Sequence, residues 1–353
     1  LAKFLKKKKI KLIVICFEDK INLGKYEKNI KVIKLSNNQN FIKKAINLKE
    51  TIDNINYKGM VLLYDLKSSA YAQLANIKNY NVALTDPPSL AKKNLSRLYS
   101  KMKWHRKYKY KIKDKIFKKI AKQGIENANK TFVMSKWNSK EFKKKYKVQP
   151  KVIYPGIFGE FNKKGVTCKI LHPKKNLNLI SISRLTKSKN LIWLLYGVKH
   201  LLNKNEKNKF FKNINLKILG SGPELTNLKN ISKKLNIFKN IKFYGKVSEN
   251  KKNKLISASH INLIAAYSAY NLPALESIRM GVPVVINEAC RMKEVLKNNK
   301  MTKNTKNNQS SFIKSLDNYV EILKKKKIKN YKVNHLPTFN NWANDLSKSC
   351  GWY

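Results

Sequence analysis

Short apolar runs alternate with amphipathic helical stretches along the chain, and this alternation limits the possible folds more than any other feature of the sequence. Repeated β–α alternation predicts parallel sheets that are covered by helices on both faces. The expected strands are residues 11–17, 59–64, 80–84, 130–134, 151–154, 177–183, 215–219, 241–244, 262–265 and 283–287. The expected helices are residues 40–50, 68–77, 113–129, 139–146, 191–202, 224–235, 249–258 and 272–280.

The length of 353 residues predicts two domains, each with its own core. We expect an α/β fold of two Rossmann-like domains that face a cleft, with ligands beyond the carboxyl ends of the strands. The first domain is residues 1–158, a Lys-rich linker is 159–176, and the second domain is 177–336. Residues 337–353 carry aromatic side chains and are expected to pack back on the body, and residues 297–309 are expected to form a mobile loop.

The net charge of +57 excludes an acidic, halophile-like surface and is compatible with nucleic acid, anionic lipid or phosphorylated ligands. A hydrophobic fraction of 42% argues against a disordered polycation. Only five of the 77 basic residues are Arg, so we attribute the charge mainly to an AT-rich genome. Because no known nucleic-acid motif or stacking platform is visible, we expect no nucleic-acid partner.

The four cysteines lie far apart in the sequence and form no CxxC pair, which argues against a zinc site, and we expect no metal. The longest apolar run, residues 12–17, is too short to span a bilayer, and no signal peptide is visible. We therefore expect a cytoplasmic protein. The sequence begins with Leu1 rather than Met, so we expect the first domain to be truncated at its amino terminus.

Two cations follow an expected strand of the second half. Arg184 and Lys189 belong to one loop that leads into a helix, where they would form a clamp for a pyrophosphate. The alternative is an ordinary surface loop of a Lys-rich protein, although Arg is scarce here. Gly220 and Gly222 follow the next strand and indicate either a backbone that approaches a ligand or a simple turn.

A helix with a good amino-terminal cap follows a later strand. Asn271 is the expected cap residue, and Pro273 suits the first turn. The free N–H groups at this helix start would form a second anion site. Glu276, about one turn further on, has a carboxylate that suits a ribose diol or simply the positive end of the helix dipole.

Five motifs follow one another in the second half of the chain: RLTKSK at 184–189, GSGPE at 220–224, IKFYG at 241–245, NLPALE at 271–276 and GVPVV at 281–285. With these motifs, residues 177–296 resemble the nucleotide-binding domain of glycosyltransferase family 4 (group 1), whose members have the GT-B fold. Residues 127–158 and 339–342 resemble the end of the first domain and the terminal segment of that family.

The resemblance implies a retaining glycosyltransferase that moves a sugar from a nucleoside-diphosphate sugar to a glycan or lipid-linked acceptor. It implies no cofactor and no metal, because side-chain cations would compensate the leaving-group charge. The implied residues are Arg184, Lys189, Asn271 and Leu272 for the diphosphate, Glu276 for the ribose, Gly222, Tyr244 and Val247 beside the base, Ser268, Ala269 and Tyr270 near the sugar, and Thr85 and Asp86 on the acceptor side.

The sequence departs from the family pattern at three places, and the first and the last of them support an alternative, a non-catalytic relative that binds nucleotide sugars. The first Glu of the family's paired-glutamate motif is replaced by Ser268. Thr85 and Asp86 stand where a His is often found. The family's first strand and glycine-rich loop are not recognisable ahead of residue 10.

A basic and aromatic cluster around Trp104 and His105 suggests peripheral contact with an anionic membrane at its cytoplasmic face. The remaining histidines lack the spacing of metal ligands, and we expect them to be structural or exposed. They are His172, His200, His260 and His335.

Overall fold

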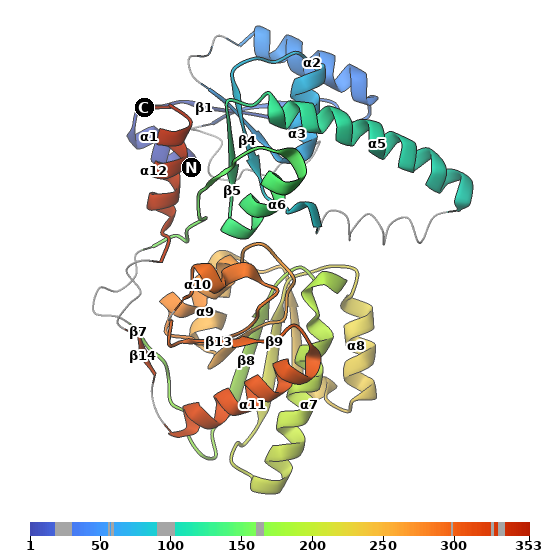
Figure 1. Ribbon diagram of the computed structural model, residues 1–353. Helices are drawn as coiled ribbons and strands as arrows, with labels where there is room; N and C mark the ends of the chain where they lie inside the picture. Colours follow the sequence, from blue (N-terminus) through green and yellow to red (C-terminus); the bar gives the residue numbers. More distant parts are fainter. Residues whose placement is uncertain are drawn as a thin grey trace. The chain divides into compact units, whose positions relative to one another are not determined.

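The computed structural model describes residues 1–17, 30–55, 57, 60–89, 103–159, 166–297, 299–325, 328–330 and 336–353. The chain forms two compact units, which are both visible in Figure 1. The first unit is Leu1–Gly156 together with Phe339–Tyr353, and the second is Ile157–Thr338. The end of the chain therefore belongs to the same unit as its beginning.

The first unit contains a parallel sheet of four strands in the order β3-β4-β5-β6 and a parallel pair, β1 and β2. Its strands are β1 (Leu12–Cys16), β2 (Ile30–Lys34), β3 (Val61–Tyr64), β4 (Tyr80–Leu84), β5 (Lys130–Val133) and β6 (Lys151–Val152). Its helices include α1 (Ala2–Lys7), α2 (Phe41–Asp53), α3 (Asp65–Leu74), α5 (Trp104–Glu126), α6 (Lys136–Tyr146) and α12 (Phe339–Ser349).

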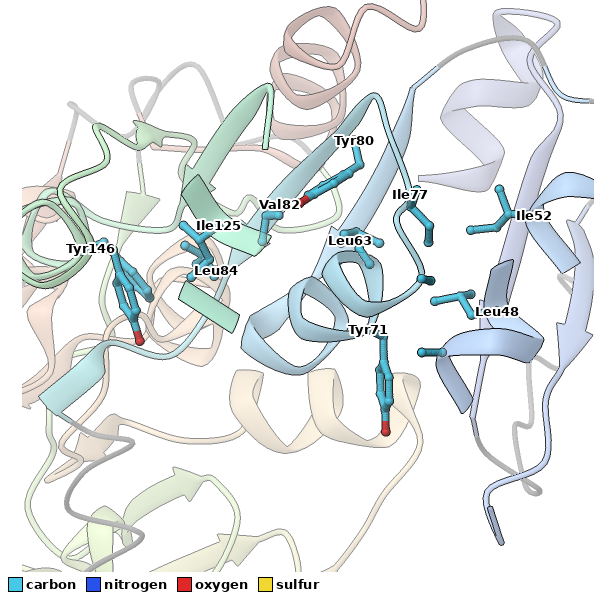
Figure 2. Packing of buried hydrophobic residues seen from close by; sticks show 14 of the residues in the cluster. Leu48, Ile52, Leu63, Tyr71, Ile77, Tyr80, Val82, Leu84, Ile125 and Tyr146 are labelled. Atoms are coloured by element: carbon cyan, nitrogen blue, oxygen red, sulfur yellow. The ribbon is translucent and has the colours of Figure 1, made fainter. Parts of the chain in front are cut away.

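The core of the first unit lies between its helices and strands (Figure 2). Val82 and Leu84 of β4 are buried there together with Ile125, near the end of α5. A second cluster joins the end of the chain to the sheet, because Leu346 and Cys350 pack with Phe132 of β5. The buried members of the first cluster that Figure 2 labels are Leu48, Ile52, Leu63, Tyr71, Ile77, Tyr80, Val82, Leu84, Ile125 and Tyr146.

The second unit contains a parallel sheet of six strands in the order β10-β9-β8-β11-β12-β13. Its strands are β8 (Leu177–Ile182), β9 (Ile214–Leu219), β10 (Ile241–Gly245), β11 (Ile261–Ile264), β12 (Val284–Asn287) and β13 (Thr302–Thr305). Its helices include α7 (Leu191–Asn208), α8 (Leu225–Lys234), α9 (Glu249–Ser257), α10 (Leu272–Arg279) and α11 (Gln309–Lys325). Helices α7 and α11 pack side by side (Figure 1).

Two segments of the second unit differ from expectation. Residues 166–176, expected as part of a linker, include β7 (Val166–Thr167), which pairs with β14 (Lys329–Asn330), and the buried Cys168. The expected mobile loop at 297–309 instead contains β13, which pairs with β12 at the edge of the sheet. The pairing of β13 depends on backbone hydrogen bonds at an edge and not on an apolar pattern, so its polar sequence gave no strand signal.

Candidate functional site

Three neighbouring strands of the six-stranded sheet end at one edge of the second unit, and their loops are hydrogen-bonded to one another. The Leu185 N–H, after β8, donates to the Ser221 carbonyl oxygen, after β9, over 3.0 Å. The Tyr267 N–H, after β11, donates to the Ser188 carbonyl oxygen over 2.8 Å. The loops that follow β8, β9 and β11 therefore form one connected surface at the edge where parallel sheets bind ligands.

The two glycines after β9 allow its loop to lie against the backbone of the loop after β8. Gly220 has a φ of +125°, and a Cβ atom there would lie 2.0 Å from the Ser183 carbonyl oxygen. A Cβ atom on Gly222 would lie 2.4 Å from the Leu185 carbonyl oxygen. The two glycines therefore let this backbone lie close to the loop that carries Arg184, and the expected approach to a ligand stays a prediction.

Arg184 is exposed in the loop after β8, and Lys189 is partly buried at the end of a 3₁₀ turn, η2 (Lys187–Lys189). The next residue, Asn190, adopts the left-handed conformation with a φ of +49°. Its side-chain amide donates to the Ala265 carbonyl oxygen over 2.9 Å. This bond fixes the end of the Arg184 loop to the end of β11.

The start of α10 is capped as expected. The Ala274 N–H donates to Oδ1 of Asn271 over 3.0 Å, and Pro273 lies in the first turn. The Asn271 N–H is directed at the sulfur of Met292, 3.2 Å away. Asn271 is buried, whereas Leu272 is 38% exposed. Asn271 is thus held by its contacts with Ala274 and Met292, and the first turn of the helix remains partly open to solvent.

Ser268 is buried between the loops after β11 and β12. Its hydroxyl donates to the sulfur of Cys290 over 3.1 Å, and its carbonyl oxygen accepts from the Arg291 N–H over 3.0 Å. Burial raises the pKa of the Cys290 thiol to about 11, although the hydrogen bond from Ser268 and the charges of Lys189 and Arg291 oppose this rise. The thiol is therefore neutral and unreactive at pH 7, and two cations lie near it.

Glu276, the predicted ribose ligand, forms an ion pair in the structure. Its Oε1 lies 2.8 Å from Nζ of Lys252 on α9, which also bonds Glu249 over 2.7 Å. Burial lowers the pKa of Lys252, but the hydrogen bonds to the two carboxylates outweigh this effect and raise it. No described residue donates to Oε2 of Glu276, which is buried. A hydroxyl of a ligand is a suitable partner for this oxygen.

The residues expected beside the base lie at the edge of the sheet. Tyr244 is in β10, and its ring lies under Nζ of Lys242 and Lys251, at 5.3 and 5.8 Å from the ring centroid. Tyr244 and Val247 both pack against a cluster that includes Ile180 of β8. Ala269 is buried, and Tyr270 is partly buried just before the α10 cap.

Thr85 and Asp86, expected on the acceptor side, follow β4 in the first unit. The Thr85 carbonyl oxygen accepts from the side-chain amide of Asn138 over 3.0 Å, and Asp86 is exposed. The described contacts of the two residues lie within the first unit.

Sequence reasoning missed three residues of this site, namely Lys252, Cys290 and Arg291. Nothing in the sequence pairs Lys252 with Glu276, because the pair depends on the packing of α9 against α10. The scarcity of Arg, which singled out Arg184, could also have singled out Arg291, since both belong to the five arginines of the chain. Cys290 had none.

With this geometry established, the chain can be compared with known proteins. Residues 167–333 match the family described as glycosyl transferases group 1. That stretch contains the whole six-stranded sheet and every loop of the site. A curated relative is the UDP-N-acetylglucosamine–peptide N-acetylglucosaminyltransferase GtfA subunit of Streptococcus agalactiae, 23% identical over 240 residues. The match covers 64% of this chain and 39% of that protein, so the chain spans about two fifths of the relative's length.

Solved structures resemble nearly the whole chain. Sucrose-phosphate synthase from Thermosynechococcus elongatus has a TM-score of 0.69 at 12% identity and covers 99% of this chain and 87% of its own. Anabaena HepE, in complex with UDP and glucose, has a TM-score of 0.68 at 14% identity, with coverages of 97% and 92%. The chain has the GT-B fold. The matches do not favour the alternative of a non-catalytic relative.

Two further findings concern only the part of the chain that the structure describes. None of its helices combines the length and the apolar character that a bilayer crossing requires. Among the same residues, no three or more His, Cys, Asp or Glu side chains are grouped as metal ligands would be.

Proposed function

We propose that this chain is a retaining glycosyltransferase of family 4 type, which transfers a sugar from a nucleoside-diphosphate sugar to a glycan or lipid-linked acceptor. The observation that carries the proposal is the 2.8 Å hydrogen bond between the Tyr267 N–H and the Ser188 carbonyl oxygen. It attaches the loop of Arg184 and Lys189 to the segment that leads into the capped start of α10. Two cations and the amino end of a helix dipole thus belong to one hydrogen-bonded set of loops.

In this proposal Arg184 and Lys189 hold the donor diphosphate, with the first-turn N–H groups of α10 next to Asn271 and Leu272. Their positive charge stabilises the nucleoside diphosphate as it leaves the sugar. Because these fixed groups supply the charge that a divalent ion supplies elsewhere, we propose that the reaction needs neither a metal nor another cofactor.

The carboxylate of Glu276 is the proposed ribose ligand. Lys252 already occupies Oε1, so Oε2 is the oxygen that would accept from a ribose hydroxyl. Lys252 holds the carboxylate in its orientation while the ribose binds. The base would lie beside Gly222, Tyr244 and Val247.

The sugar is proposed to lie near Ser268, Ala269 and Tyr270. Ser268 brings a neutral hydroxyl where the resemblance implies a carboxylate, and Lys189 and Arg291 lie near its partner Cys290. We propose UDP as the donor nucleotide, because HepE was solved with UDP and glucose and pneumococcal GtfA with UDP and GlcNAc. The acceptor is proposed to bind in the first unit, near Thr85 and Asp86.

Calorimetric titration of the chain with UDP-, GDP- and ADP-sugars tests the proposal. We expect saturable binding of a UDP-sugar that Arg184→Ala weakens by about 1–3 kcal/mol, the size of a lost charge-assisted hydrogen bond. Lys187→Ala is the matched control, because it removes a positive charge from an exposed position of the same loop. Equal losses of binding free energy in both variants would show that Arg184 acts only through its general positive charge. Absence of binding of any sugar nucleotide would refute the proposal.

A second proposal concerns where the enzyme acts, and it is carried by an exposed stripe on α5. Trp104, Tyr108, Ile112 and Ile116 follow one another at intervals of four residues and are 82, 67, 45 and 56% exposed. Such spacing places them along one side of the helix, among lysines. We propose that this stripe contacts an anionic membrane at its cytoplasmic face, with the aromatic rings at the interface and the lysines near the headgroups.

Vesicle flotation tests the membrane contact, with the intact chain and vesicles that contain either 30% or no phosphatidylserine. We expect binding to the anionic vesicles only, and a clear loss in Tyr108→Ala. Tyr110→Ala is the matched control, because Tyr110 is 51% exposed on the opposite side of the same helix. Equal binding of the two variants would contradict a role for this stripe.

A further inference from the structure

An open cavity of about 420 Å³ lies in the second unit, at the edge of the sheet opposite to the proposed donor site. Asn176 and His260, which line it, immediately precede β8 and β11, so the cavity is at the amino ends of these strands. Its volume lies within the usual range for small-molecule sites. Its lining includes the basic and titratable residues Lys169, His172, Lys175 and His260.

The ring of His260 is fixed in one tautomer by the neighbouring strand. The Asn178 N–H donates to Nδ1 of His260 over 3.0 Å, and the His260 N–H donates back to the Asn178 carbonyl oxygen over 2.8 Å. Since Nδ1 accepts a hydrogen bond, the neutral ring carries its proton on Nε2. His260 is therefore a hydrogen-bond donor at the cavity.

The charged groups around this histidine are all positive. Burial and, after it, the charges of Lys169, Lys217 and His172 together lower the pKa of His260 to about 4, against a smaller opposing effect of the hydrogen bond from Asn178. Burial, and after it the charge of Lys169, also lowers the pKa of Lys217. The described residues that line the cavity include no Asp or Glu.

Hydrogen bonds hold one of these lysines in place. Nζ of Lys169 donates to the Ser257 carbonyl oxygen over 2.7 Å, at the end of α9. Nζ of Lys217 lies 3.5 Å from the neighbouring Ala258 carbonyl oxygen. Neutral carbonyl groups leave the ammonium charges uncompensated, so an anion in the cavity would relieve the repulsion between them.

We propose that this cavity binds a phosphate monoester of a small metabolite, with the lining residues Lys169 and Lys175 and the Nε2–H group of His260 as its polar contacts. A dianionic phosphate group matches both the donors and the uncompensated charge. The cavity is far larger than a phosphate ion, which leaves room for the organic part of the molecule.

Nitrogen NMR of the histidine side chains, with the full chain, tests the proposal at the site itself. Inorganic phosphate and glycerol 3-phosphate are titrated separately against a background of 150 mM NaCl. We expect a saturable shift of the His260 ring nitrogens and a rise in the pKa of His260, because a bound anion favours the imidazolium form. Tighter binding of glycerol 3-phosphate identifies the monoester as the ligand class, and equal binding of the two probes contradicts it.

Charge variants separate this site from general attraction of anions. We expect Lys169→Gln, in the lining of the cavity, to weaken the binding about tenfold or more, as the loss of one charge-assisted hydrogen bond does. Lys229→Gln, on the exposed surface of α8, should leave it unchanged. Lys175→Gln, at a second lining position, should weaken the binding as well.

The outcomes that overturn the proposal are no saturable response of His260, or equal weakening by the cavity and surface variants. The donor site is distinguished by Arg184→Ala, which should leave the response of His260 to glycerol 3-phosphate intact. The proposal is thus independent of the proposed transferase activity.

Discussion

The hydroxyl of Ser268 donates a hydrogen bond to the sulfur of Cys290, 3.1 Å away, and thereby joins the loops that follow β11 and β12. Both side chains are buried, at 7% and 1% exposure. The position where the resemblance implies a carboxylate therefore holds a small polar group with a partner of its own. Lys189 and Arg291 lower the pKa of the same sulfur, although burial outweighs their effect, so two positive charges act on this position.

Replacement of Ser268 by Glu should raise the rate of sugar transfer. The cations of Lys189 and Arg291 would stabilise the new carboxylate, which would in turn place a negative charge near the sugar. The measurement is kcat with a UDP-sugar that the chain binds. Ser268→Gln is the control, because it adds nearly the same volume without the charge.

Two results would contradict the placement of Ser268 beside the sugar. One is an unchanged kcat in a Ser268→Glu protein that still binds the donor. The other is an equal gain in Ser268→Gln, which would make volume and not charge responsible.

A methyl group at Gly220 should destabilise the second unit and abolish donor binding. The Cβ atom would lie 2.0 Å from the Ser183 carbonyl oxygen, at a φ of +125°. We expect Gly220→Ala to lower the free energy of unfolding by at least about 3 kcal/mol. Gly245→Ala is the control, since at its φ of +65° nothing lies within 4 Å of the added atom. It should cost about 1 kcal/mol, and similar losses in both variants would show that the contact with Ser183 is unimportant.

Loss of the α10 cap should affect both stability and donor affinity. Asn271→Ala removes the acceptor of the Ala274 N–H, and we expect about 1 kcal/mol of lost stability by thermal or urea unfolding. Asn40→Ala removes an equivalent cap in the first unit, where Oδ1 accepts from the Lys43 N–H over 2.9 Å. Both variants should lose similar stability, but only Asn271→Ala should bind a UDP-sugar more weakly. An equal affinity of the two variants for the UDP-sugar would show that the start of α10 does not contribute to donor binding.

His260 should make the protein less stable in mild acid. Its pKa is about 4 in the folded protein and 6.5 in the unfolded chain. Between these values the unfolded chain binds a proton that the folded protein does not, so stability falls as the pH drops from 6.5 to about 4. Because solvent reaches part of the ring, we expect a contribution of the order of 2 kcal/mol.

Urea unfolding in phosphate-free buffer at a series of pH values measures this effect. The loss of stability between pH 6.5 and about 4 should be smaller in His260→Gln. It should be unchanged in His105→Gln, because the ring of His105 is exposed on α5. A His260→Gln protein with the full pH dependence would assign the effect to other groups.

Much of the proposed donor site could be predicted from the sequence, because the sequence signals for its loops and helix start are local. The start of α10 followed from Asn271 and Pro273, since capping depends on residues within one turn. Gly220 and Gly222 stood out in a chain with only 12 glycines, and both lie close to the backbone of the neighbouring loop, although the sequence alone pointed to a ligand or a simple turn. All strands of the second sheet except β13 were visible as apolar runs, and β11 and β12 are buried on both faces.

The remaining features depend on contacts between distant segments. The pair of Glu276 with Lys252 requires α9 and α10 to pack, and a sequence with this many lysines offers no reason to select one of them. His260 was expected to be structural or exposed, because its role depends on the strand that holds Nδ1 and on lysines 91 and 43 residues away. The parallel strand β2 was missed, because the Lys residues at its exposed positions interrupt the apolar pattern.

The chain passes between its two units twice, and the two passages pair with each other at Ile157 and Thr338. The ribosome must therefore finish the whole second unit before the residues that complete the first unit have been made. Until then Phe132 and Ile153 lack the partners that Leu346 and Cys350 later supply. A chain that stops after Thr338 would thus expose an apolar surface in its first unit while its second unit is intact. A chaperone would therefore bind the first unit, although most of that unit is synthesised before the second.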